Sequence, residues 1–106
     1  MRDTDELISI IDGYFGDIIE RVVVDHGYDV DLNDEYYELL SYITRNLIRT
    51  WFRGKNPTLE EVEKKVRYIK NRYPRRLSML LSYLISKYVR MRNRIYGIQR
   101  DRRDFW

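Results

Sequence analysis

The sequence predicts an all-α fold: a single small domain built as a four-helix bundle, with a basic C-terminal tail. Apolar residues recur at helical spacing in four segments, and no segment shows sustained period-two alternation between hairpin turns. A chain of 106 residues with 43% hydrophobic side chains can pack one core. We expect a bundle over residues 1–97, with helices at residues 4–25, 34–53, 58–73 and 74–96, and a charged tail at residues 98–106.

The first helix has the clearest pattern. Its apolar residues follow the i, i+3, i+4, i+7 spacing of one wide stripe: Leu7, Ile10, Ile11, Tyr14, Phe15, Ile18, Ile19, Val22 and Val23. Asp3 or Thr4 can cap its start, and Gly27 is expected to stop it. Gly13 and Gly16 lie inside the helix, where each costs about 1 kcal/mol relative to alanine. We therefore expect a kink there, or the close approach of another backbone.

Capping residues bound the second and third helices. Asn33 or Asp34 is expected to open the second helix, and Gly54 to close it. Thr58 and Glu61 form a Thr-x-x-Glu capping box, in which each residue satisfies a free backbone N–H of the other. The third helix is therefore expected to begin at this pair.

Proline sets the start of the fourth helix. Pro74 breaks the third helix and suits the first turn of the next. The apolar residues of the fourth helix are Leu77, Leu80, Leu81, Leu84, Ile85, Tyr88, Met91 and Ile95. Gly97 is expected to end the helix.

A row of small residues lies on the fourth helix, on the side opposite its main apolar stripe. Ser78, Ser82 and Ser86 repeat every four residues. A partner helix can pack closely along such a row, or the serines can be neutral positions in solvent. Together with the terminal aromatic pair, Phe105 and Trp106, they are our candidates for a protein interface.

Charge is distributed very unevenly along the chain. Residues 1–44 hold two basic and twelve acidic side chains, whereas residues 45–106 hold eighteen basic and five acidic ones. The overall charge of +3 therefore hides an acidic first half and a basic second half. The two halves can neutralise each other across the fold. Alternatively, the basic half faces a polyanion, and the acidic half faces a basic partner or repels nucleic acid.

Arginine dominates the cations of the basic half. A guanidinium group binds phosphate oxygens bidentately and also stacks on bases, and tyrosines interleave with these charges as base stacking requires. The alternative is that an Arg-rich surface reflects heat adaptation. Our candidates for contact with DNA or RNA are Arg45, Arg49, Arg53, Arg75, Arg76, Lys87, Arg90, Arg94, Arg102 and Arg103.

The sequence offers little for catalysis or metal binding. It has no cysteine and one histidine, His26, and it lacks a glycine-rich phosphate loop, a G-x-S-x-G elbow and an HExxH motif. The aspartates near His26 do not have EF-hand spacing, so we interpret them as helix caps and loop residues: Asp25, Asp29, Asp31 and Asp34. His26 is expected to interact with the helix end. We therefore predict no enzyme activity, no metal, no cofactor and no small-molecule substrate.

No apolar run approaches the roughly 18 residues that span a bilayer, and no signal peptide precedes the first helix. A soluble, cytoplasmic protein without a membrane partner is expected.

Two stretches resemble the helical domain of the archaeal GINS replication factors. Leu32–Ile43 is similar to that family's Leu-x-x-x-aromatic-Tyr segment, which a Tyr-Ile pair follows on the same helix. Leu84–Ile95 is similar to its Arg-rich helix, which packs in the tetramer. The family's small β-domain is absent, and residues 58–73 have no counterpart. The resemblance implies a non-catalytic scaffold subunit that links a helicase to other replisome proteins.

These observations predict a non-enzymatic helical adaptor or scaffold that binds a protein partner or a second copy of itself, within a machine for DNA replication or transcription. Abundant Arg, Ile and Tyr with scarce Gln and no Cys indicate a thermophilic archaeon or its virus. One alternative is a small dimeric DNA-binding regulator with a helix-turn-helix at Tyr73–Pro74. Another is a virus-encoded inhibitor of a host protein. Cations of the second and fourth helices on one face would favour nucleic-acid binding, whereas interdigitation with first-helix acids would favour the adaptor.

Overall fold

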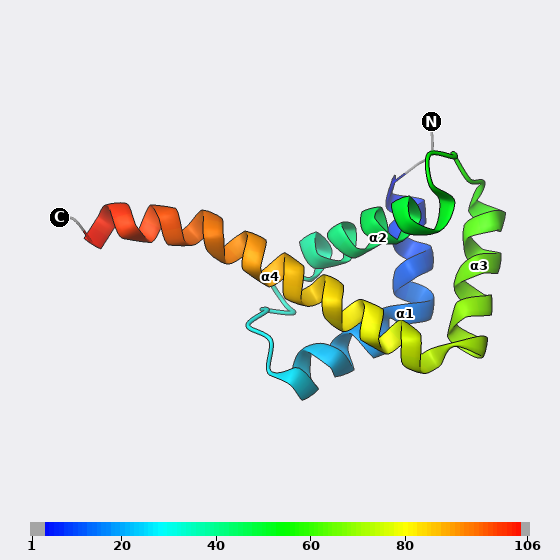
Figure 1. The fold of residues 1–106 in the computed structure, drawn as a ribbon, viewed down its shortest axis with the longest axis horizontal. Coiled ribbons are helices and arrows are strands. Elements are labelled where there is room, and N and C mark those ends of the chain that lie inside the picture. Colours follow the sequence, from blue (N-terminus) through cyan, green and yellow to red (C-terminus); the bar gives the residue numbers. More distant parts are fainter. Residues whose placement is uncertain (1–3, 105–106) are drawn as a thin grey trace.

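The computed structural model describes the backbone of residues 4–104 and the side chains of residues 4–95. Within this part the chain forms the predicted all-α four-helix bundle, without strands (Figure 1). The helices are α1 (Thr4–His26), α2 (Tyr36–Phe52), α3 (Leu59–Arg72) and α4 (Pro74–Asp104). Both α1 and α4 contact all three other helices, so they form the centre of the bundle, with α2 and α3 at its flanks.

The core is built where the predicted apolar stripes meet. Phe15 of α1 is fully buried, and its ring meets Trp51 of α2 edge-on, with the ring centres 6.3 Å apart. Each buried side chain of this size contributes about 1.5–3 kcal/mol relative to an exposed one. The fully buried side chains are Ile11, Phe15, Ile19, Leu39, Ile43, Leu47, Val62, Val66, Leu77, Leu81 and Ile85.

Most of the predicted helix boundaries are confirmed. The hydroxyl of Thr58 accepts a hydrogen bond from the backbone N–H of Glu61 at 3.1 Å, and the Glu61 carboxylate accepts one from the Thr58 N–H at 2.8 Å. Gly27 and Gly54 follow α1 and α2 with φ of 64° and 73°, a left-handed conformation that glycine adopts at little cost. Pro74 opens α4 directly after α3.

The start of α2 differs from the prediction. Asn33 and Asp34 do not cap the helix, which begins at Tyr36. They lie in the preceding turn, where their backbone N–H groups donate to the Asp31 carboxylate at 2.9 and 3.2 Å. These two hydrogen bonds lower the pKa of Asp31. Glu35 accepts in turn from the Asp31 N–H at 3.0 Å, so a local side-chain network closes this turn before the helix begins.

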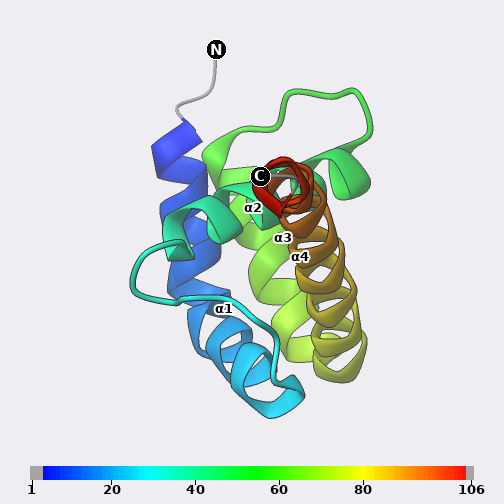
Figure 2. The same cartoon turned by 90° about the vertical axis from the view of Figure 1, so that its left-hand side faces the viewer.

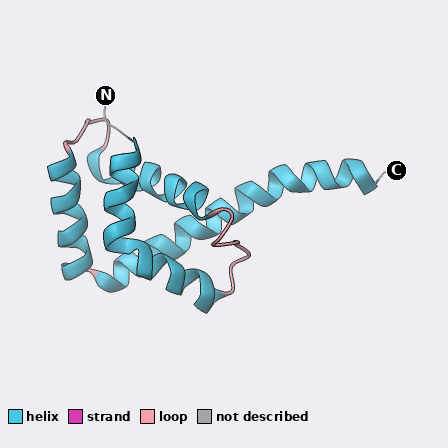
Figure 3. Cartoon of the chain, turned by 180° about the vertical axis from the view of Figure 1, so that it is seen from behind, coloured by secondary structure: helices cyan, strands magenta, loops and turns pink. Residues whose placement is uncertain are grey.

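The two glycines inside α1 have different surroundings. A Cβ at Gly13 would meet nothing within 4 Å, so the expected approach of another backbone is wrong there. A Cβ at Gly16 would lie 2.7 Å from Oδ1 of Asp12 and 3.3 Å from the Tyr36 hydroxyl, so the close neighbours are side chains. The other expectation was a kink, and α1 does change direction along its length (Figures 1 and 3).

The fourth helix continues past Gly97, where the sequence predicted its end, to Asp104. One glycine costs only about 1 kcal/mol in a helix, and the residues after it include good helix formers and no proline. This C-terminal part of α4, residues 90–104, is called the arm. Its first turn still borders α2, and its end extends beyond the other helices (Figure 1) and points toward the viewer in Figure 2. It explains a radius of gyration of 15.3 Å, against about 13 Å for a compact chain of this length.

Candidate functional site

Cationic side chains gather on the surface where α2 and α4 lie side by side. Two adjoining hollows of about 260 and 280 Å³ share Tyr42 of α2 and Met91 of α4. Arg45 lines the first of them. It also lines a third hollow, of about 420 Å³, together with Arg49. The second of the two adjoining hollows is lined by Lys87, Arg90 and Arg94 of α4. We call the five cations around these hollows the basic surface: Arg45, Arg49, Lys87, Arg90 and Arg94.

Helical spacing places these cations. Arg45 and Arg49 are one turn apart on α2, so they share a face. Lys87, Arg90 and Arg94 follow an i, i+3, i+7 spacing on α4 and also share a face. All five are exposed. Because Tyr42 and Met91 line both of the adjoining hollows, Arg45 and the three cations of α4 meet around this pair. Arg49 lies one turn further along α2, at the hollow between α1 and α2.

The basic surface makes no ion pair with the acidic half of the chain in the described part, although Glu38 lines the same hollow as Arg45. Among the side chains that the structure describes, both ion pairs belong to Arg92, which contacts Glu35 and, at 3.5 Å, Asp29. The five cations of the basic surface make no ion pair in this part. Of the two arrangements expected from the sequence, the convergence of α2 and α4 is therefore observed, and interdigitation with acids of α1 is not.

Glu35 holds Tyr88, which lines the first of the two adjoining hollows. The Tyr88 hydroxyl donates to the Glu35 carboxylate at 2.9 Å, and the Tyr88 ring meets Tyr42 with centres 5.6 Å apart. Burial, followed by this hydrogen bond, raises the pKa of Tyr88. Since Glu35 also pairs with Arg92, one carboxylate joins the linker before α2 to the root of the arm. The sequence analysis did not single out Glu35, Tyr42 or Met91 as site residues, although Tyr42 stands three residues before Arg45 on one helix face.

The other predicted cations lie elsewhere. Arg53 follows the last turn of α2, and Arg75 and Arg76 are in the first turn of α4. The Arg76 guanidinium lies over the Tyr73 ring, 5.5 Å from its centre. These three do not join the hollows shared by α2 and α4. The side chains of Arg102 and Arg103 lie outside the described residues.

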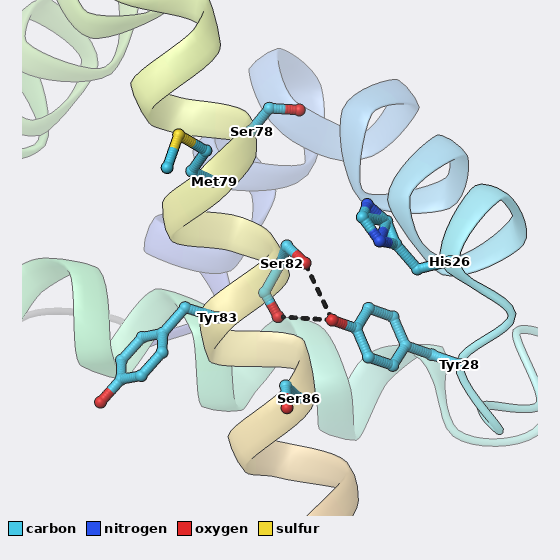
Figure 4. Close-up of a pocket in the computed structure, with 7 residues that line it drawn as sticks. All are labelled: His26, Tyr28, Ser78, Met79, Ser82, Tyr83 and Ser86. Atoms are coloured by element: carbon cyan, nitrogen blue, oxygen red, sulfur yellow. Dashed lines mark hydrogen bonds between the residues drawn. The ribbon is translucent and has the colours of Figure 1, made fainter.

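The serine row faces the end of α1 across a groove of about 440 Å³ (Figure 4). Ser78, Ser82 and Ser86 line one wall of this groove. The Tyr28 hydroxyl lies 2.8 Å from the Ser82 hydroxyl and donates to its backbone carbonyl at 3.2 Å, and the His26 ring stacks on Tyr28. The chain's own linker therefore contacts the middle of the row. A partner helix along it stays a prediction, and Phe105 and Trp106 lie outside the described residues.

No group of three or more His, Asp or Glu side chains in the described part is arranged to hold a metal ion. His26 is the last residue of α1, as expected for a side chain that interacts with the helix end. None of the helices in this part is long and apolar enough to cross a membrane.

No family model matches the chain, and no curated protein and no solved structure matches it. The resemblance to the GINS replication factors therefore stays a prediction.

Proposed function

We propose that this chain is a non-enzymatic helical subunit that binds the phosphates of DNA or RNA through its basic surface. The observation that carries the proposal is the convergence of cations from α2 and α4 around Tyr42 and Met91, without ion pairs in the described part. Exposed cations without acidic partners are free to replace the counterions of a polyanion.

Aromatic and apolar side chains between the charges also support this function. Tyr37 and Tyr42 line the same hollow as Arg45, and Met91 lies between this hollow and the next. Tyr37 is 59% exposed. Single-stranded nucleic acids bind by combining cations for the backbone with flat side chains for the bases. We therefore favour a single strand over a duplex as the ligand.

The regulator alternative receives less support from the backbone. A helix-turn-helix joins its two helices through a turn of 3–4 residues. Only Tyr73 separates α3 from α4. The scaffold role that the resemblance to GINS implies is compatible with our proposal, because a scaffold in a replication complex can contact nucleic acid without acting on it.

The proposal is tested by reversing two charges of the basic surface. In the variant with Arg90→Glu and Arg94→Glu, the affinity for a fluorescent single strand at low salt should fall about tenfold or more, because two phosphate contacts are replaced by repulsion. The matched control carries Lys64→Glu and Arg72→Glu, two exposed positions on α3, with the same change in net charge. Equal losses in both variants would show that overall charge, and not this surface, attracts the ligand.

A further inference from the structure

One apolar stripe of α4 runs off the end of the bundle. The stripe consists of Leu77, Leu81, Leu84, Tyr88, Met91 and Ile95, with alternating spacings of four and three residues. This is the heptad spacing of helices that pack side by side. Its first four residues are at most 5% exposed, whereas Met91 is 43% and Ile95 is 54% exposed. The same face of one helix is thus buried inside the bundle and uncovered on the arm.

The described residues cover Met91 and Ile95 only in part. The arm belongs to the same continuous helix, and its end runs away from the other helices (Figure 1). In the region around Met91 the last anchoring contacts are those of Arg92 with Glu35 and Asp29. These two apolar side chains lie together on a projecting helix, where a second molecule can pack on them.

The charges beside the stripe define that molecule. Arg90 and Arg94 are exposed next to Met91 and Ile95, so a partner surface must be acidic with an apolar component. Two arms packed on each other would bring these cations together and repel. An acidic amphipathic surface is required.

This chain presents such a surface on α1. Gly13, Asp17, Glu20 and Val24 lie on one exposed face, with spacings of four, three and four residues. Val24 is 68% exposed, and neither Asp17 nor Glu20 forms an ion pair among the described residues. A glycine in the middle of a helix, with open space where its side chain would be, also allows another helix to approach closely.

We propose that a second copy of this chain docks the acidic face of its α1 on the arm, covering Met91 and Ile95 and pairing Asp17 and Glu20 with Arg90 and Arg94. Each copy carries both surfaces, so a reciprocal exchange closes a two-fold dimer. The inference is independent of the proposed function. Combined with the proposed function, it implies that self-association and phosphate binding compete for Arg90 and Arg94.

Sedimentation equilibrium with charge-swapped variants tests the dimer. The unmodified protein should dimerise at low salt and dissociate in 1 M salt, where electrostatic interactions reach only about 3 Å. The variant with Arg90→Glu and Arg94→Glu should be a monomer, and so should the variant with Asp17→Arg and Glu20→Arg. Their equimolar mixture should dimerise again, because each arm then meets an α1 face of opposite charge.

Apolar substitutions complete the test. Met91→Ser with Ile95→Ser should weaken the dimer about tenfold or more through lost burial. Met79→Ser, which removes an exposed methionine outside the stripe, should leave it unchanged. The mixture also controls for folding, since misfolded variants would not restore each other.

Three results would overturn the inference. They are an unmodified protein that stays monomeric up to about 0.5 mM, a mixture that stays monomeric, and a dimeric Asp17→Arg, Glu20→Arg variant, which would indicate pairing of arm with arm. The last variant keeps the basic surface intact, so its affinity for a single strand separates failure of this inference from failure of the proposed function.

Discussion

The buried part of α4 and its arm belong to one helix with one spacing of apolar residues, yet their environments are opposite. Leu81 is fully buried among the other helices, whereas Ile95, two heptads later on the same stripe, is 54% exposed. The helical period fixes which face of α4 is apolar. The other helices cover this face only along the part of α4 that they contact. The buried part therefore supplies stability, and the arm leaves part of the same face exposed to solvent.

The largest expected effect separates these two parts. Leu81→Ala should lower the free energy of unfolding by about 2–5 kcal/mol, because it leaves a cavity in the core. Ile95→Ala should change it by less than about 0.5 kcal/mol, as at other exposed positions. Urea unfolding followed by circular dichroism measures both. Similar losses at the two positions would show that the arm is packed within the single chain.

The contact that joins the two parts is tested at Glu35. Glu35→Gln removes the charge that pairs with Arg92 and accepts from Tyr88, and should cost about 1–3 kcal/mol. Glu38→Gln, an exposed position in the first turn of α2, is the matched control and should cost little. If thermal unfolding of the two variants is indistinguishable, the linker does not anchor the root of the arm.

High pH should lower the stability of the fold by ionising Tyr88, in the buried part of α4. The pKa of Tyr88 is raised in the folded chain by burial and by the hydrogen bond to Glu35, so folding favours the protonated phenol. Stability is then complete below the ordinary tyrosine pKa of about 10 and declines above it, by up to about 1.4 kcal/mol per pH unit. Tyr88→Phe should reduce this decline, and the exposed Tyr83→Phe should not. A decline of equal slope in both variants would contradict the assignment.

The smallest effect compares the two glycines of α1. Gly13→Ala should stabilise the monomer by about 1 kcal/mol, because the helix gains propensity and the new methyl group meets open space. Gly16→Ala should gain nothing or destabilise, since its Cβ would lie 2.7 Å from Asp12 Oδ1. Thermal unfolding at low concentration and high salt measures both without interference from association. The reverse order would contradict the packing of Asp12 and Tyr36 around Gly16.

The sequence was sufficient for the features that local rules control. Helical spacing predicted the four helices, and the Thr58–Glu61 capping box and Pro74 predicted two of their boundaries. It failed where several residues compete for one role, as when Asp31 closes the turn instead of Asn33 or Asp34 capping α2. It also placed the end of α4 at Gly97, because a single glycine weakens a helix without stopping it.

Which cations belong to the candidate site depends on how the helices pack against one another. The spacing of Arg45 and Arg49 places them on one face of α2, but only the packing of α2 against α4 brings Arg45 to a hollow that adjoins the one lined by Lys87, Arg90 and Arg94. Arg49 lines a hollow between α1 and α2 instead. The same packing leaves Arg53, Arg75 and Arg76 apart from this group. Sequence spacing describes one helix at a time, and so it cannot select among cations on different helices.

The central claim, that the basic surface binds phosphate, is tested most directly by titrating the unmodified protein into a fluorescent single strand over a range of salt concentrations. Each phosphate contact contributes about 0.7 to the slope of log affinity against log salt for a single strand. Five cations therefore predict tight binding at low salt and a slope of about −3.5. Absence of binding at low salt, or binding with a slope near zero, would contradict the account.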